Sequence, residues 1–316
     1  MSALRETGHQ AGDAVLPAGV TVFERGWLSS NSILLVEART CALVDSGYVT
    51  HAPQTLSLVQ QALGPRPLDL LLNTHLHSDH CGGNAALQQA YPGLRTHIPP
   101  GLAPQVAQWD DEALSYTPTG QQCPRFRFDA LLQPGTEMRL AGQAWQVHAA
   151  PGHDPHSVIL FEPDTRTLIS ADALWQNGFG VVFPELEGMD AFDEVGATLD
   201  LIAALRPSTV IPGHGAVFTG VEPALEAARR RLDSFLCSPL RHAQHAAKVL
   251  IKFKLLEWQR IPRQALANWA GDTRYLGLLH RRYFGDMPLA QWIEQISEDL
   301  VRAGVARMED GELVNA

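Results

Sequence analysis

Short apolar runs alternate with amphipathic segments through the first two-thirds of the chain. SILLVEA (32–38) and CALVDSG (41–47) are rich in strand-forming residues and are separated by two residues, which predicts a hairpin. Residues 51–64 space apolar side chains at helical intervals and end at Gly64, which predicts a helix. LDLLLN (68–73) is a continuous apolar run typical of a buried strand.

The same alternation continues toward residue 214. Further strands are predicted over 145–150, 158–163, 167–172 and 209–214, and helices over 84–91 and 189–207. Residues 99–128 are rich in Pro, Gln and Gly and have no clear period, so we expect a long loop there. Strands alternating with helices indicate an α/β sandwich with its sheets inside and its helices outside.

From about residue 222 the pattern becomes helical. Helices are predicted over 221–236 and 241–259, and residues 289–316 are interpreted as a helix, a turn and a short hairpin, an order typical of a winged helix. The charge balance changes a little later, near residue 239. Residues 1–239 carry 13 Arg and no Lys against 25 acidic residues, whereas residues 240–316 carry 11 basic and 9 acidic residues. We therefore predict one domain over 1–237 and a smaller, winged-helix-like domain over 238–316.

Composition narrows the class of protein. The chain of 316 residues is 45% hydrophobic, enough for a sizeable core, and its net charge of −10 disfavours general affinity for nucleic acid. No apolar run approaches the ~20 residues of a membrane helix. MSALRETGHQAGDAV lacks a basic segment followed by an apolar one, so we expect no signal peptide. Four scattered cysteines favour reduced thiols in a cytoplasmic protein, and Cys81, beside two glycines, is expected in a packed turn.

The segment THLHSDHCGG (74–83) directly follows the predicted strand 68–73. Alternate residues at the end of a strand point the same way, so His75 and His77 should share one side. The turn into a helix should bring Asp79 and His80 to the same cavity. Imidazole nitrogens and carboxylate oxygens are common zinc ligands, and burying four such groups without a metal would be costly. This cluster therefore predicts a metal site.

Three more residues of the same chemistry lie at or beyond the ends of other predicted strands. PGHDPHS (151–157) places His153 in a loop after a strand, and ISAD (169–172) places Asp172 at a strand end. IPGHG (211–215) places His214 in a turn flanked by glycines. If these strand ends share one edge of the core, the seven side chains are enough for two metal ions.

The order of these motifs, from an early Asp45 through HxHxDH to single His, Asp and His residues, resembles the metallo-β-lactamase superfamily over roughly residues 20–231. The resemblance implies an αββα sandwich with a dimetal site between the sheets. It also implies two divalent ions, zinc or else iron or manganese, whose shared water attacks the substrate. Asp79 and Asp172 would be catalytic. The implied ligands are His75, His77 and His153 for one ion, Asp79, His80 and His214 for the other, and Asp172 for both.

Departures within the motifs narrow the function that the resemblance implies. True class B lactamases lack a bridging aspartate at Asp172, so the chain is more similar to the glyoxalase II, lactonase and RNase branches. Similar lactonases carry a tyrosine where this chain has Trp175, which argues against lactonase activity. His156 replaces a glycine of the common motif and is a candidate for substrate contact. Asp45 is expected to orient a ligand histidine, or else to cap a turn.

We therefore expect a dimetal hydrolase of a small carboxylic ester or thioester, similar to glyoxalase II. Residues 240–316 would then form a lid or a homodimerisation element, and the segments 99–128 and 174–188 would line the pocket. Alternatively, a winged helix with Lys248, Lys252, Lys254 and Arg260 would bind RNA, as in a β-lactamase-like RNase. That alternative ranks second, because a nearly neutral tail on an acidic body offers few phosphate contacts. A mono-iron enzyme similar to persulfide dioxygenases is the third interpretation.

Overall fold

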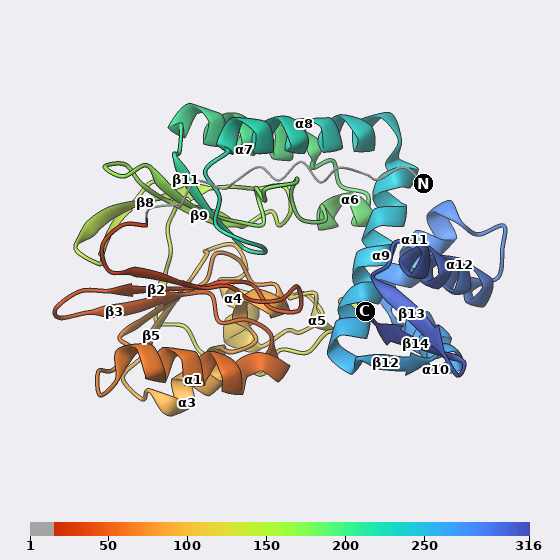
Figure 1. The fold of residues 1–316 in the computed structure, drawn as a ribbon, viewed down its shortest axis with the longest axis horizontal. Helices are drawn as coiled ribbons and strands as arrows, with labels where there is room; N and C mark the ends of the chain where they lie inside the picture. Colours follow the sequence, from red (N-terminus) through yellow and green to blue (C-terminus); the bar gives the residue numbers. More distant parts are fainter. Residues whose placement is uncertain (1–15) are drawn as a thin grey trace, which may run out of the picture.

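The computed structural model describes residues 16–316, so the expectation about a signal peptide concerns a segment outside the described residues. Two mixed sheets lie face to face and helices cover their outer surfaces (Figure 1). The predicted αββα sandwich is therefore confirmed. Within residues 16–316, no helix is long and apolar enough to cross a membrane.

The first sheet has the strand order β1-β2-β3-β4-β5-β6. The predicted hairpin is confirmed, because β2 and β3 pair antiparallel with Leu35 opposite Ala42. Alternate residues serve two layers: Leu34 and Leu43 pack under helices α1 and α3, whereas Leu35 faces the second sheet. The elements of this half are β1 (Val20–Phe23), β2 (Ser32–Val36), β3 (Cys41–Val44), α1 (Ala52–Leu63), β4 (Leu70–Leu72), α2 (Ser78–Cys81), α3 (Asn84–Ala90), β5 (Arg95–Ile98) and β6 (Ala130–Leu131).

The second sheet has the order β11-β10-β9-β8-β7 and is covered by α7 and α8 (Figure 1). Trp145, fully buried on β8, fills the space between the two sheets together with Ile169 and Ile211. Leu168 and Val210 point the other way and pack with residues of α7 and α8. The elements are β7 (Glu137–Leu140), β8 (Gln143–Ala149), β9 (Val158–Glu162), β10 (Thr167–Ala171), α6 (Phe183–Glu187), α7 (Phe192–Leu205), β11 (Thr209–Pro212) and α8 (Val221–Cys237).

The prediction of one long loop over 99–128 is wrong in part. Two short helices interrupt it, α4 (Ala103–Gln108) and α5 (Tyr116–Thr119). They form because Val106, Leu114 and Tyr116 pack around Phe126 in a small core of their own. Helices of six and four residues are too short to produce a readable period in the sequence.

The C-terminal region begins with the long helix α9, which stands across the edge of both sheets (Figure 1). The helix, turn and hairpin predicted for 289–316 are confirmed, and β12 completes a sheet of order β12-β14-β13. The core of this region also takes in Val181 and Leu186, so it is packed against the sandwich. Its elements are α9 (Pro239–Trp258), β12 (Arg260–Pro262), α10 (Arg263–Asp272), α11 (Arg274–Tyr283), α12 (Leu289–Arg302), β13 (Ala306–Glu309) and β14 (Glu312–Asn315).

Candidate metal centre

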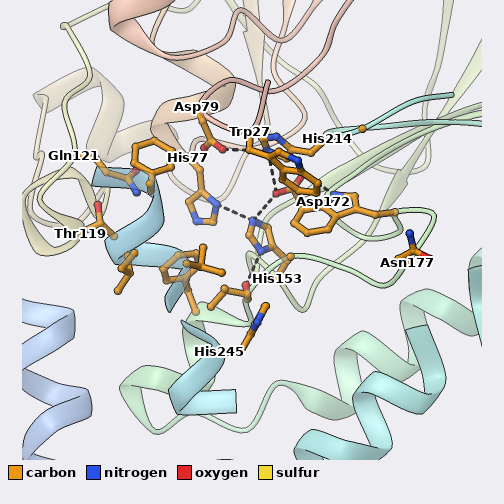
Figure 2. A pocket seen from close by; sticks show the side chains of 18 of the residues that line it. Trp27, His77, Asp79, Thr119, Gln121, His153, Asp172, Asn177, His214 and His245 are labelled. Carbon is orange, nitrogen blue, oxygen red and sulfur yellow. Dashed lines mark hydrogen bonds and ion pairs between the residues drawn. The ribbon is translucent and has the colours of Figure 1, made fainter. Parts of the chain in front are cut away.

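The structure brings all seven predicted metal-competent side chains together. They form three overlapping groups, within each of which the candidate ligand atoms lie no more than 4.8 Å apart. Figure 2 shows five of the seven pointing toward one another at one end of a pocket. The three groups are His75 with His77 and His153, His75 with His80 and Asp172, and Asp79 with His80 and His214.

Parallel strand ends place two of these residues side by side. β10 and β11 pair in parallel, so Asp172, directly after β10, and His214, two residues after β11, emerge at the same edge. The backbone between them is close-packed, because a Cβ atom on Gly213 would lie 2.1 Å from Oδ1 of Asp172. A Cβ atom on Gly180 would likewise lie 2.4 Å from Nδ1 of His153. Glycine at both positions leaves room for the site.

Asp45, expected to orient a ligand histidine, is hydrogen-bonded to His80. Nδ1 of His80 donates to Oδ2 of Asp45 at 2.8 Å, which leaves Nε2 directed at Asp172, 3.4 Å away. Asp45 is held in turn by the backbone N–H of Thr74 at 2.9 Å and by its hydroxyl at 2.8 Å. The chain of contacts fixes which nitrogen of His80 faces the centre.

Backbone and carboxylate groups also fix the ring orientations of His153 and His77. Nδ1 of His153 donates to the carbonyl of Val181 at 2.5 Å, so its Nε2 faces Nδ1 of His77 at 2.8 Å. On the far side of His77, Nε2 lies 3.8 Å from Oδ2 of Asp154. Sequence reasoning missed the buried Asp154, although its place directly after His153 in PGHDPHS was the available signal.

Burial and neighbouring charges set the protonation of the cluster. Burial, followed by the nearby histidines His80, His77 and His153, holds the pKa of His75 well below its usual value. Burial also lowers the pKa of His77, to about 4. Both imidazoles are therefore neutral at pH 7 and offer lone pairs.

The carboxylates give the centre a field that favours cations. Burial alone would raise the pKa of Asp172, but His214 and His80 hold it well below its usual value, so the group is ionised. Burial alone would lower the pKa of His80, but Asp45 and Asp172 hold it well above its usual value. A field that favours a proton on His80 also favours a metal cation there.

The donor set fits a pair of divalent metal ions. Among residues 16–316, Nε2 of His75 and Nε2 of His80 are buried without a hydrogen-bond partner. Such buried atoms are costly unless a ligand satisfies them. Together with the ionised Asp172, these nitrogens offer the imidazole and carboxylate ligands that zinc, iron and manganese accept.

The centre opens into a cavity of about 510 Å³ whose walls come from distant parts of the chain. Trp27, missed by sequence reasoning, stacks on His214 with ring centroids 5.4 Å apart, and it meets Trp175 edge-on at 5.2 Å. Trp175 also donates from Nε1 to Oδ1 of Asp172 at 3.2 Å. The segments 99–128 and 174–188 contribute lining residues, as expected, and α9 adds His245, Val249, Leu250 and Phe253.

Two residues that the sequence singled out do not line this cavity. His156 is exposed, and its ring lies against Gly101, where a Cβ atom would come within 2.1 Å of Nδ1. Cys81 is buried and lies outside the three metal-competent groups. Its Sγ lies 3.2 Å from the hydroxyl of Tyr116 and 3.7 Å from Sγ of Cys123, as expected for a packed thiol.

Comparison with known proteins gives a consistent result. The model of the metallo-beta-lactamase superfamily matches residues 25–214. A hydroxyacylglutathione hydrolase from Anaeromyxobacter dehalogenans is 32% identical over 206 residues, which cover 63% of this chain and 69% of that protein. The beta-lactamase-like protein 2 homolog of Drosophila melanogaster is 25% identical, over 60% of this chain and 59% of that protein.

Solved structures show that the likeness in fold extends into the C-terminal region. A metallo-beta-lactamase family protein from Thermus thermophilus is similar with a TM-score of 0.58 and 18% identity, over 96% of this chain and 100% of that chain. A beta-lactamase domain protein from Burkholderia ambifaria has a TM-score of 0.59 and 19% identity, over 96% of this chain and 94% of that chain.

Proposed function

The chain belongs to the metallo-beta-lactamase superfamily and is a metal-dependent hydrolase, and on this premise we propose that it hydrolyses a small carboxylic thioester or ester. We propose two zinc ions as its cofactors. When bound, such ions activate water and stabilise negative charge on a substrate oxygen. The proposed ligands are His75, His77 and His153 for one ion, Asp79, His80 and His214 for the other, and Asp172 between them.

The protein residues around the centre have distinct proposed roles. Asp172 stays ionised and neutralises positive charge between the two ligand groups. Asp79 lines the cavity, with its Oδ2 3.2 Å from Nε2 of His214, and is placed to accept a proton from the attacking water. Trp27 and Trp175 wall the same end of the cavity and restrict the access of bulk water.

The observation that carries the proposal is the cavity itself. One end is lined by five of the seven proposed ligands, and the wall supplied by α9 includes the apolar side chains of Val249, Leu250 and Phe253. Phe183 adds an aromatic face against His77, with ring centroids 4.9 Å apart. A partly apolar cavity beside a hydrolytic centre suits an acyl group.

The relatives support the same reaction class. The hydroxyacylglutathione hydrolase from Anaeromyxobacter dehalogenans acts, by its name, on a thioester. A protein from Aspergillus fumigatus named atrochrysone carboxyl ACP thioesterase is 23% identical, over 62% of this chain and 40% of that protein. We also propose that residues 238–316 form a winged-helix-like domain whose helix α9 serves as a wall of the pocket.

Cleavage of RNA ranks below this proposal because the basic residues expected to bind RNA already have partners within the protein, Lys254 with Glu257 among them. Lys248 pairs with Asp299 at 2.7 Å, and Arg260 pairs with Glu312 at 2.8 Å. Lys252 donates to backbone and amide oxygens of the small C-terminal sheet region. Phosphate binding through counterion release needs several clustered free cations.

A substrate panel on metal-loaded protein tests the proposal. Acyl thioesters, lactones and labelled RNA are offered in parallel, and elemental analysis gives the metal content of protein purified without added metal. We expect thioester or ester turnover and close to two metal ions per chain. Strong RNA cleavage with no turnover of any thioester or ester would refute the proposed substrate class. A preparation free of transition metal but fully active would refute the proposed centre.

A further inference from the structure

Arg231 of α8 differs from the other ionisable residues of the cavity because it carries a permanent positive charge. Within residues 16–316 it is the only arginine or lysine that lines this cavity. It is half-buried, and burial lowers the pKa of its guanidinium, although arginine stays charged in proteins. A charge placed in a partly desolvated cavity is costly unless an opposite charge meets it.

The neighbours of Arg231 hold its guanidinium without neutralising it. One N–H donates to the carbonyl of Phe179 at 3.1 Å. The group also lies against Gly178, where a Cβ atom would come within 2.5 Å of Cζ. Among the described residues no carboxylate lies within ion-pair distance, and His245, whose pKa burial and then Arg231 lower to about 4, carries no charge at pH 7.

The two neighbouring arginines of α8, unlike Arg231, form ion pairs with carboxylates. Arg229 pairs with Asp200 at 2.7 Å, and Arg230 lies 3.5 Å from Glu226. Both side chains are more exposed than Arg231. The helix therefore pairs the cations that it presents to solvent, and it leaves unpaired the one that it presents to the cavity.

We propose that Arg231 binds an anionic group of the substrate, a carboxylate or a phosphate, while the scissile carbonyl lies at the metal centre. The guanidinium fork is the protein group best suited to such an anion, because its charged N–H groups bind two oxygens at once. The inference rests on the proposed function and deepens it. The substrate is then an acyl thioester or ester with one anionic end and an apolar part against Val249, Leu250 and Phe253.

Matched substrates with Arg231→Gln test this role. Glutamine keeps an N–H donor for the carbonyl of Phe179 but removes the charge. One butyryl group is presented on N-acetylcysteamine, which is neutral, on glutathione, which carries carboxylates, and on coenzyme A, which carries phosphates. A fourth substrate, succinyl-N-acetylcysteamine, places a carboxylate on the acyl side.

We expect KM to rise roughly 10- to 100-fold for the anionic substrate that the site prefers, and to change little for the neutral thioester. The affected substrate identifies the anion. Arg229→Gln, on the solvent-facing side of the same helix, is the matched control and should leave all four KM values unchanged. Equal losses for neutral and anionic substrates would overturn the proposal, because they would show that Arg231 only supports the Phe179 carbonyl.

A binding measurement separates this inference from the proposed reaction. Calorimetry compares S-butylglutathione, S-butyl-coenzyme A, S-butyl-N-acetylcysteamine and S-(3-carboxypropyl)-N-acetylcysteamine, which carries a carboxylate on the acyl side. The proteins compared are metal-loaded wild type, Arg231→Gln and, if that variant unfolds, Arg231→Met. Weaker binding confined to the anionic thioethers supports the anion site even when no thioester is turned over. Unchanged binding of all four thioethers by a folded variant would refute it.

Discussion

Gly213→Ala should disable the centre without removing any of its donors. In the structure, a Cβ atom at this position would lie 2.1 Å from Oδ1 of Asp172, and also 3.0 Å from the carbonyl carbon of Ala171. Ordinary contacts between such atoms begin at about 3.4 Å, so the carboxylate would have to move by about 1.3 Å or the turn would have to open. Either movement changes the position of Asp172 relative to His80 and His153.

The magnitude follows from the tolerance of catalytic geometry. A misplacement of about 1 Å costs on the order of 100-fold in rate, which corresponds to about 2.7 kcal/mol of transition-state stabilisation. We expect kcat/KM to fall by at least that factor and one metal ion to bind more weakly. Overpacking of this kind costs about 1–3 kcal/mol in the free energy of unfolding, so the fold should survive.

Three measurements on the purified variant check this reasoning. They are kcat/KM for the preferred thioester, metal content by elemental analysis, and the melting temperature. Gly93→Ala is the control, because a Cβ atom there meets nothing within 4 Å and Gly93 does not occupy a left-handed conformation. A Gly213→Ala protein with wild-type rate and metal content would refute the close packing of Asp172 against this turn.

Three further predictions concern the proposed metal ions, the proposed ligand Asp172 and the response of the protein to acid. Chelation should abolish hydrolysis, and added zinc should restore it, as a steady-state assay would show. Asp172→Asn should loosen one metal and cut kcat/KM by at least ~100-fold while the melting temperature changes little; unchanged metal content would contradict the ligand assignment. His242 accepts from the N–H of Val182, and burial followed by His245 lowers its pKa to about 3. Its stabilising contribution is complete above about pH 6.5 and is lost as pH falls toward 3. In denaturant unfolding between pH 6 and 4, His242→Gln should therefore reduce the slope of the unfolding free energy by up to about 1.4 kcal/mol per pH unit, while the contributions of the other buried histidines remain.

The candidate centre could be located from the sequence because its donors lie next to predictable strands. Asp172 directly follows β10 and His214 lies two residues after β11, and both strands are continuous buried runs that the apolar pattern reveals. Parallel pairing then brings such ends together. The apolar pattern predicts His75 and His77 at the end of a strand, but β4 ends at Leu72, so the loop that leads into α2 positions them instead. The two side chains still lie close together, because a tight turn also brings neighbouring side chains near one another.

The surroundings of the centre could not be predicted, because they depend on contacts between distant segments. Trp27 is exposed and lies in an irregular stretch between β1 and β2, and nothing in the local sequence shows that it stacks on His214. Phe253 fits the apolar period of α9 as an ordinary core residue, and it does pack on Tyr48 while also lining the cavity. The apolar periodicity of a helix shows that one of its faces is buried, but it does not show which segment packs against that face.

The candidate metal ligands and the proposed anion site lie on different parts of this chain. The superfamily model covers residues 25–214, and all seven candidate ligands fall inside that range. Arg231 and the α9 residues of the cavity fall outside it. Membership of the superfamily therefore supports the reaction at the metal centre but carries no information about the far wall of the pocket. That wall combines apolar side chains with a cation that has no ion-pair partner among residues 16–316. We therefore expect substitutions in α8 and α9 to change KM, whereas substitutions around Asp172 should change kcat.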